Sequence, residues 1–455
     1  MASALVDANG LTSEQANDLL GHSAMGVQLN LLMGLPGFMD MAVKVLSAKL
    51  KTGVDPQNDL DIRELAGQVS TGIRDSMQNR LLEDFQALEA DVVFTLLLLA
   101  FSGVTVDRKS TLITPGMTLE DASTCSGVVW TSQCGDAVQT VLPPVVQYQA
   151  VRHCSLQGQQ PRWTSLLNAM QASLPFPFTN TTAGPPFERL VALAIASKTH
   201  LFSAGISNAM VRHGICTWSD FLPNAAMSSL LGDSAFKVRA LNLAQDSHQL
   251  LRSTEGGKGE LDVTVESETH LETAETQGSP RLAWSDPDCL VSMDPVQGAA
   301  SPCGDLRFVG QTATGKQQLV VVQCKTVGAG TKKGRNRAAY PKDIEQHLTQ
   351  LRACVERWNQ ANQYEQMELV YVWVTTAKAS TKLLTYADQQ QDLIVVHHEA
   401  LPRLCPLLGL APELYTVKPL AVAPTPPRPR QGKARRPSQQ QGSALPETHA
   451  LAHVV

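Results

Sequence analysis

An acid, an amide and a lysine lie at the two ends of one short hairpin pattern in this 455-residue chain. Asp305 begins the apolar segment 305–311, and Gln323 and Lys325 end the apolar run LVVVQCK. Residues at i and i+2 of a strand point to the same face, and a turn brings the ends of two strands together. Carboxylate and amide oxygens are ligands for Mg²⁺, and a lysine beside them can assist the attack of water on a phosphodiester. The spacing therefore indicates metal-dependent phosphodiester chemistry, although Gln323 and Lys325 would also suit a plain solvated strand end.

The turn between these strands contains GQTATGKQ (310–317), which differs by one residue from the phosphate-binding pattern G-x-x-x-x-G-K-[ST]. Gln317 stands where that pattern needs a Ser or Thr hydroxyl for Mg²⁺. The sequence that follows Lys316, QQLVVVQ, is rich in β-branched residues, whereas a phosphate loop must lead into a helix. We therefore expect a hairpin turn at Thr314-Gly315-Lys316, with the glycine in the left-handed region, and no nucleotide cofactor.

Two further acids need an interpretation. Glu188 stands near the start of a long helical pattern, PPFERLVALAIASKTHLF, where its residue type is that of a capping acid of the first turn. Asp288, in SDPDCLV, is an alternative to Asp305 as the acid on the first strand. We prefer Asp305 because it heads the strand that leads directly into the turn.

A basic loop follows the candidate lysine. Lys332, Lys333, Arg335 and Arg337 lie in the Gly-rich sequence TVGAGTKKGRNRAAY. Cations at this position would contact the phosphates that flank a cut, with an affinity that falls as the salt concentration rises. The same four charges are equally compatible with a solvated loop that binds nothing.

In their order along the chain, these features resemble the PD-(D/E)xK nuclease superfamily: a helix that begins with Phe-Glu, then an Asp, a hairpin, and Gln-x-Lys. The Gln-x-Lys form is similar to the Mrr-like branch and to the nuclease domains of Crinkler-type and retrotransposon-hot-spot effectors. The resemblance implies a restriction-endonuclease-like mixed sheet flanked by helices. It also implies that Asp305, Glu188 and Gln323 hold Mg²⁺ or Mn²⁺, that Lys325 completes the catalytic set, and that the substrate is nucleic acid, DNA in particular.

The glutamine leaves two classes of function open. A neutral amide oxygen is a weaker ligand for Mg²⁺ than a carboxylate, so Gln323 lowers the charge that holds the metal. The chain is therefore expected to be a metal-dependent endonuclease or, alternatively, a catalytically inactive nuclease-like effector that binds nucleic acid or protein.

The resemblance extends upstream of the candidate site. LLMGLPGFMDMAVKVL (31–46) resembles the helical lid that follows a P-loop ATPase, and LLLLAFSGVTVD with TLEDASTCSGVVW resembles the winged-helix region after such a lid. No Walker A motif precedes these segments, so an ATPase remnant is the third interpretation. Because no basic residue lies between Lys109 and Val151, we favour a connector over a DNA-binding module for the winged-helix-like region.

Hydrophobic periodicity predicts the elements that would position these residues. The pattern predicts helices at 91–101, 118–126 and from Pro185 onward, and a hairpin of strands at 128–130 and 137–141. From residue 305 the pattern alternates, which predicts an α/β fold: strands at 305–311, 319–325, 367–375 and 393–397, and helices at 341–360 and 381–389.

Composition divides the chain into several regions. They are a helical lid-like region (1–83), a winged-helix-like region (84–150), a polar linker (151–183), a nuclease-like domain (184–412) with an acidic insertion (252–280), and a disordered basic Pro/Gln-rich tail (416–455). The tail carries a short cluster, Lys433, Arg435 and Arg436, that resembles a nuclear-import signal. We therefore expect a nuclear or cytoplasmic location.

The bulk composition excludes some classes of protein. Nine cysteines without a C-x-x-C pair indicate a reducing compartment with neither a disulfide framework nor a zinc site. The most apolar segment, 92–101, is far shorter than the roughly 20 residues of a membrane span. The N-terminus lacks the basic and apolar regions of a signal peptide. We therefore expect no membrane partner.

Overall fold

The computed structural model describes residues 1–9, 11–22, 36–52, 58–126, 129–134, 136–157, 163–173, 184–207, 214–246, 289–293, 305–326, 339–361 and 366–410, together with Met25, Gly26, Leu29 and Asp55. All of them belong to one compact unit that covers residues 1–418, and a second unit covers 419–455. Several predictions concern segments outside the described residues: the acidic insertion 252–280, Asp288, the cations Lys332, Lys333, Arg335 and Arg337, and the tail 416–455.

The N-terminal part of the chain is helical, as predicted. Its helices are α1 (Ala2–Asn9), α2 (Ser13–Gly21), α4 (Pro36–Leu50) and α5 (Asp59–Gln86). Thr12 caps α2, because its Oγ1 accepts a hydrogen bond from Gln15 N (3.1 Å) while Gln15 Oε1 accepts one from Thr12 N (2.9 Å). α4 begins at Pro36, a position where the missing N–H of proline costs no helical hydrogen bond.

The next elements surround one fully buried helix. They are α6 (Ala90–Ser102), β1 (Thr105–Val106), β2 (Leu112–Thr114), β3 (Met117–Thr118), α7 (Leu119–Ser126), β4 (Trp130–Cys134), β5 (Ala137–Val141), α8 (Pro144–Leu156) and α9 (Thr164–Ser173). Every residue of α6 from Val92 to Ser102 is buried, which confirms that this apolar segment is a core helix. Gly103 ends α6 with a φ of 63°, and a Cβ at this position would lie 2.8 Å from the carbonyl oxygen of Arg403.

The predicted hairpin after α7 is present, but its first strand is longer than the sequence suggests. Where a strand was expected at 128–130, β4 begins at Trp130 and continues to Cys134, which pairs with Ala137 of β5. The polar side chains at 131–133 hide this strand in the sequence because they interrupt the apolar pattern. The segment expected to be a polar linker also contains the end of α8 and all of α9.

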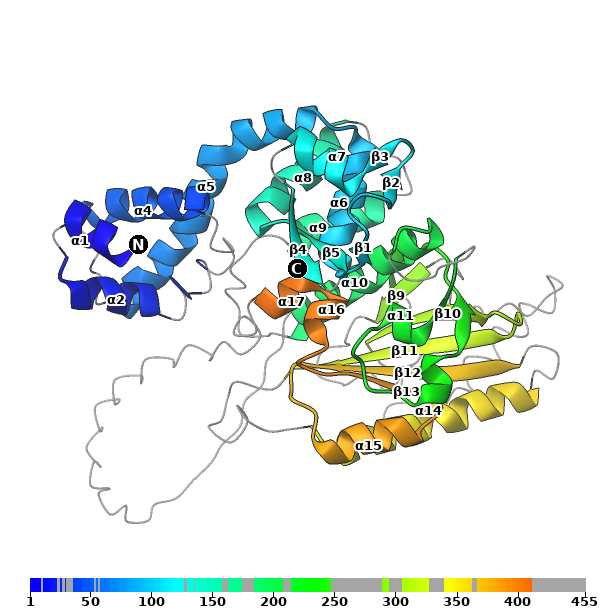
Figure 1. The fold of residues 1–455 in the computed structure, drawn as a ribbon. Coiled ribbons are helices and arrows are strands. Elements are labelled where there is room, and N and C mark those ends of the chain that lie inside the picture. Colours follow the sequence, from blue (N-terminus) through cyan, green and yellow to red (C-terminus); the bar gives the residue numbers. More distant parts are fainter. Residues whose placement is uncertain are drawn as a thin grey trace, which may run out of the picture. The chain divides into compact units, whose positions relative to one another are not determined.

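The second half of the described chain is built on a curled mixed sheet (Figure 1), which confirms a mixed α/β architecture. Its strand order is β13-β12-β11-β10-β7-β6, and β9 pairs with β10 and with β8. The strands are β6 (Ile215–Thr217), β7 (Ala235–Lys237), β8 (Asn242–Asp246), β9 (Cys289–Met293), β10 (Leu306–Thr312), β11 (Gln317–Lys325), β12 (Met367–Thr375) and β13 (Leu393–Val396). The helices of this half are α10 (Gly184–Ser203), α11 (Trp218–Phe221), α12 (Ser229–Gly232), α14 (Lys342–Ala361), α15 (Thr381–Gln389), α16 (Leu401–Leu404) and α17 (Pro406–Leu410).

The alternation predicted after residue 305 is confirmed. β10 and β11 pair antiparallel, whereas β11, β12 and β13 are mutually parallel. Parallel neighbours need a crossover, and α14 and α15 supply one each. The bounds of β12 and α15 agree with the predicted ranges 367–375 and 381–389.

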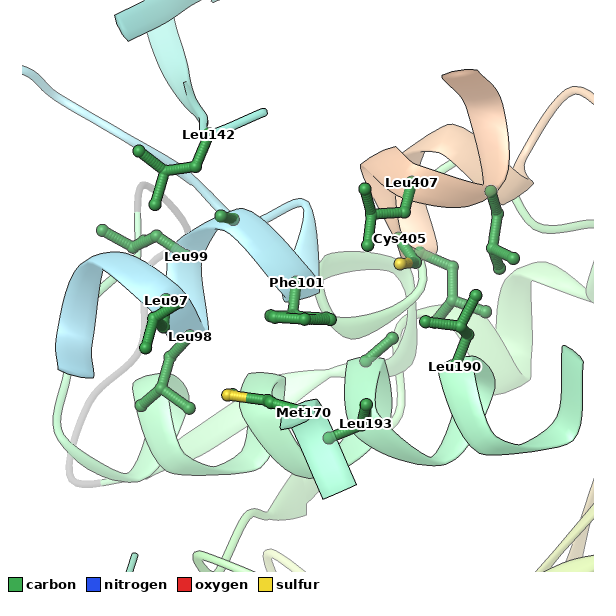
Figure 2. Packing of buried hydrophobic residues seen from close by; sticks show 14 of the residues in the cluster. Leu97, Leu98, Leu99, Phe101, Leu142, Met170, Leu190, Leu193, Cys405 and Leu407 are labelled. Atoms are coloured by element: carbon green, nitrogen blue, oxygen red, sulfur yellow. The ribbon is translucent and has the colours of Figure 1, made fainter. Parts of the chain in front are cut away.

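Successive residues of β11 pack against different helices on the two faces of the sheet. Val320, Val322 and Cys324 belong to a buried cluster with α6 and α10, and Figure 2 shows Phe101 of α6 in this cluster with Leu193 of α10. The alternate positions belong to a second cluster, in which Leu319 and Val321 pack against α14 and α15. In Figure 1, α14 and α15 lie together along one face of the sheet. The period of two residues therefore decides which helix each side chain of β11 meets.

Two expectations from the composition can be compared with the structure. None of the helices within the described ranges is long and apolar enough to cross a membrane. The cysteines whose side chains are described, Cys125, Cys154, Cys216, Cys324 and Cys405, are free thiols.

Candidate active site

The segment that resembles a phosphate loop is a hairpin turn. β10 and β11 pair continuously up to Gln311 and Gln317, and Gly315 between them has a φ of 91°. Thr312 N donates to Lys316 O (2.8 Å), and Lys316 Nζ lies 2.8 Å from Glu368 Oε1 on β12. A strand, not a helix, follows the glycine, so this segment lacks the helix N-terminus on which a phosphate loop depends. The prediction of a turn is confirmed.

Asp305 lies directly before β10 and is bound to the end of β11. Its backbone N donates to Val322 O (2.9 Å), which extends the ladder by one bond. Its Oδ2 accepts two hydrogen bonds, from Gln323 Nε2 (2.5 Å) and from the backbone N of Cys324 (2.5 Å). The hairpin therefore brings the first acid and the Gln-x-Lys segment into direct contact, which is the arrangement that the sequence predicts.

Only one of the two polar atoms of the Gln323 side-chain amide has a hydrogen-bond partner in the described part of the chain. The residue is 1% exposed, its Nε2 donates to Asp305, and its Oε1 is buried with no hydrogen-bond partner in the described part of the chain. The reverse amide orientation would place two acceptors against each other, so the hydrogen bond fixes the assignment. A buried acceptor without a partner costs about 1–3 kcal/mol, unless an ion or a water satisfies it.

Lys325 is the last residue of β11 and is half-buried. Its backbone oxygen accepts a hydrogen bond from Thr376 N (3.2 Å), which fixes the strand end to the loop after β12. Burial raises the pKa values of Asp305 and Glu188, and the ammonium charge of Lys325 opposes this rise; burial lowers the pKa of His347 on α14, and the same charge adds to that lowering. The lysine therefore lies within electrostatic reach of both candidate acids.

Glu188 approaches the site from α10. α10 begins at Gly184 and has no acidic residue in its first turn, so the capping interpretation of Glu188 is wrong. The neighbouring Phe187 and Leu190 are completely buried, and Leu190 packs in the cluster that also contains Cys324. Helix packing thus brings Glu188 near Asp305, 117 positions further along the chain by the numbering of the two residues.

Both carboxyl groups, of Glu188 and Asp305, have raised pKa values. Burial and then the charge of Asp305 raise the pKa of Glu188 to about 7, although Lys325 opposes this. Burial also raises the pKa of Asp305, against the lowering effect of the Cys324 backbone N–H, of Lys325 and of the Gln323 amide. Two buried acids that repel each other would be stabilised by a cation between them. The electrostatics therefore favour a site that binds positive charge.

Two residues near the site were not predicted as parts of it. Tyr371, on β12, is 1% exposed, and burial followed by the charge of Asp305 raises its pKa. His347, on α14, is half-buried, and burial followed by the charge of Lys325 lowers its pKa. Neither residue lies in a sequence motif. The pairing of β12 with β11 brings Tyr371 near the site, and the crossover helix α14 brings His347 there. No signal in the sequence alone would have identified them.

The candidate site contains oxygen atoms that could bind a metal ion, but only two of its donors are carboxylates. Within the described ranges, no group of three or more His, Cys, Asp or Glu side chains is placed to hold a metal ion. The candidate donors are two carboxylates, of Glu188 and Asp305, and the amide oxygen of Gln323. The alternative acid, Asp288, and the four cations of the basic loop lie outside the described residues, so their relation to this site stays a prediction.

Comparisons with models of known protein families, with curated proteins and with solved structures found no match for this chain.

Proposed function

We propose that this chain is a Mg²⁺-dependent nuclease that hydrolyses phosphodiester bonds of DNA, with a Gln-x-Lys site of the PD-(D/E)xK kind. The observation that carries the proposal is the convergence of Asp305, Gln323 and Lys325 at one end of a hairpin, with Glu188 brought to them by a separate helix. These residues are distributed over more than a hundred positions, and the packing of α10 against the sheet brings Glu188 to the hairpin.

The overall arrangement of the sheet and its helices is compatible with this proposal. The resemblance implies a mixed sheet flanked by helices, and α10 and α14 do pack on opposite faces of β11. The order of α6, α7 and the β4–β5 hairpin is what a winged-helix-like region would require. We therefore propose a restriction-endonuclease-like fold for the sheet domain and a winged-helix-like fold for the region before it. We also propose that the lid-like region (1–83) descends from the lid of a P-loop ATPase.

The donors fit a hard divalent cation. Mg²⁺ and Mn²⁺ prefer oxygen ligands, and Asp305, Glu188 and the unpaired Oε1 of Gln323 would hold one. The raised pKa values of the two acids fit the same conclusion, since a cation would restore their ionisation. When bound, the metal would stabilise the charge that develops on the phosphate and acidify its bound water.

Lys325 is the residue of this chain that would act on the reacting atoms. Its ammonium group can orient the attacking water by a hydrogen bond and can stabilise the negative charge of the transition state. Asp305 keeps the end of β11 in place through its bonds to Gln323 and Cys324, so the position of Lys325 depends on it. Asp305 therefore has two roles, as a metal ligand and as a support of the strand.

The test is cleavage of plasmid DNA in Mg²⁺ and in EDTA by wild type, Lys325→Ala, Asp305→Asn and a control, Lys316→Ala. Asn keeps an acceptor for the two N–H donors, so Asp305→Asn should stay folded. We expect cutting by wild type and Lys316→Ala in Mg²⁺ only, and a loss of at least a hundredfold in the other two variants, of the order of one removed charge-stabilising group. Equal cutting by all four proteins would refute the site.

A second function is favoured by Gln323 itself. With an amide in place of an acid, the site carries less negative charge and binds Mg²⁺ more weakly. The chain would then be a nuclease-like module that binds DNA without cutting it. Binding of DNA in EDTA that is unchanged by Asp305→Asn, with no cutting in Mg²⁺ or Mn²⁺, would support this second function and exclude the first.

A further inference from the structure

Three parallel strands of the sheet end at one edge, and hydrogen bonds fix their ends in a row. The end of β11 is bound to the loop after β12 through Thr376 N and Lys325 O (3.2 Å). The same loop accepts a bond from the end of β13, between His398 N and Ala377 O (3.1 Å). We call residues 325, 376–382 and 397–398 the carboxyl edge. These two backbone hydrogen bonds connect the three strand ends.

The loop after β12 is also fixed from the side of α14. Ala339 N donates to Lys378 O (3.0 Å), and Ser380 N donates to Ala339 O (3.2 Å). Ser380 then caps α15, with its Oγ accepting from Leu383 N (3.2 Å). Backbone hydrogen bonds on both sides therefore fix the loop that carries Lys378 and leads to Lys382, although the side chains of these lysines are exposed.

The carboxyl edge carries two exposed lysines among charges of both signs. Lys378 and Lys382 are exposed, Lys325 is half-buried, and His398 follows the last strand. α14 and α15 both begin at this edge, so the positive ends of their dipoles lie there too. The acids at the edge are Asp343, which accepts a hydrogen bond from Tyr340 N (3.0 Å), Glu345 in the same first turn of α14, the exposed Glu399 beyond His398, and Asp305 beside the end of β11.

A buried acceptor of the candidate site lies close to this edge. The buried Oε1 of Gln323, without a partner among the described groups, lies two residues before the end of β11. In open sheets of parallel strands, ligands bind outside the carboxyl ends of the strands. The unpaired amide oxygen and the exposed lysines therefore lie near the same end of the parallel strands.

We propose that the carboxyl edge is the surface on which the DNA backbone lies, with its phosphates bound by Lys378 and Lys382. A strand that follows the edge from Lys382 past Lys378 reaches Lys325, so the edge delivers one phosphate to the site formed by Asp305 and Gln323. This inference rests on the proposed nuclease function for its choice of ligand. It adds two residues, from a loop that carries no sequence motif, to the contacts with DNA.

The experiment is binding of a fluorescein-labelled 20-base-pair DNA duplex in EDTA, where no cutting occurs, over a series of salt concentrations. The proteins are wild type, Lys378→Ala/Lys382→Ala, and a control, Lys237→Ala. Lys237 is an exposed lysine of β7 that pairs with Gln311, at the opposite end of the β10–β11 hairpin. Cutting of the same duplex in Mg²⁺ by wild type is measured separately.

We expect the double variant to bind about tenfold more weakly and its log–log salt slope to fall by about 2, since each lost phosphate contact removes roughly 0.9 from the slope. Lys237→Ala should bind as wild type does. Equal affinity and slope in the double variant would overturn the inference while leaving the nuclease proposal to the cutting assay. Altered binding without any cutting by wild type would uphold the surface and refute the nuclease. Failure of wild type to bind the duplex would refute the surface directly.

Discussion

The two polar atoms of the Gln323 side chain differ in their hydrogen bonding. Its Nε2 donates to Asp305, whereas its Oε1 faces no donor within the described part of the chain. A glutamate at the same position would repel Asp305 as long as no metal is bound. The glutamine therefore makes the metal-free site more stable, and it does so by giving up one negative charge that would hold the metal.

This trade-off predicts the behaviour of Gln323→Glu. In EDTA the variant should be less stable than wild type by about 1–3 kcal/mol, because a hydrogen bond is replaced by repulsion between buried carboxylates. Mg²⁺ should restore the loss, since the added charge binds the cation more tightly. Thermal unfolding with and without Mg²⁺ measures both effects without depending on cleavage.

The control is Gln317→Glu, at the first residue of the same strand. Its position is next to Lys316, far along β11 from the site, so Mg²⁺ should not change its unfolding temperature. An equal response of the two variants to Mg²⁺, or no response in either, would contradict the assignment of Gln323 as a metal ligand.

The residues of the site differ in how far the sequence could reveal them. Asp305, Gln323 and Lys325 follow from strand periodicity and one turn, which are local properties. Glu188 was identified through a family resemblance, and its distance from the first helical turn depends on where α10 begins, at Gly184. Tyr371 reaches the site only through the parallel pairing of β12 with β11, and long-range pairing leaves no mark in the spacing of residues.

At the scale of elements, the sequence was most informative where periodicity extends over many residues. β12 is nine residues long and almost wholly buried, and it was predicted with its correct bounds. β6 and β7 have only three residues each, too few for any period to be detected. α8 was missed because Pro143 and Pro144 suggest a break, although Pro144 is the first residue of the helix and is tolerated there.

The elements around α10 are connected by one buried lysine. Lys198 is 1% exposed, and its Nζ donates to the carbonyl oxygens of Phe221 (2.9 Å) and Arg403 (3.0 Å). The Arg403 oxygen also lies 2.8 Å from where a Cβ on Gly103 would be, so α6, α10, α11 and α16 meet at this point. A neutral amine has two N–H donors, and two carbonyls satisfy them.

Lys198 should make the stability of the protein depend on pH. Burial lowers the pKa of Lys198 from 10.5 to about 7, so the folded state favours the neutral amine. Below pH 7 the full cost of burying the charge is present. Between pH 7 and 10 the stability contributed by this group should rise, by an amount on the order of a few kcal/mol. Urea unfolding at pH 7, 8, 9 and 10 measures the rise.

The comparison that isolates this effect is Lys198→Met against wild type and Lys237→Met. Other groups titrate in the same range, but they are common to all three proteins. The difference in unfolding free energy between wild type and Lys198→Met should therefore increase with pH, while that between wild type and Lys237→Met should stay constant. Parallel pH profiles for wild type and Lys198→Met would show that the lysine is charged in the folded state.

At the scale of the whole molecule, α10 connects parts that composition assigned to different regions. One buried cluster includes residues of α6, of α10 and of the face of the sheet formed by Val320 and Val322. The region expected at 84–150 and the domain expected at 184–412 thus share a core within the unit that covers residues 1–418. Elements that share a core are expected to unfold together.

Phe101→Ala tests this cooperativity. Phe101 is fully buried on α6, in the same buried cluster as Leu193 of α10 (Figure 2), and its truncation should cost about 3–5 kcal/mol. If the shared core unfolds as one, hydrogen exchange of the most protected amides in β12 should accelerate roughly a hundredfold or more, by the same factor as in α6. The control Leu112→Ala removes a side chain that is 55% exposed and should change neither. Faster exchange in α6 with unchanged protection in β12 would show instead that the sheet is an independent domain and that the candidate site does not depend on the helices before it.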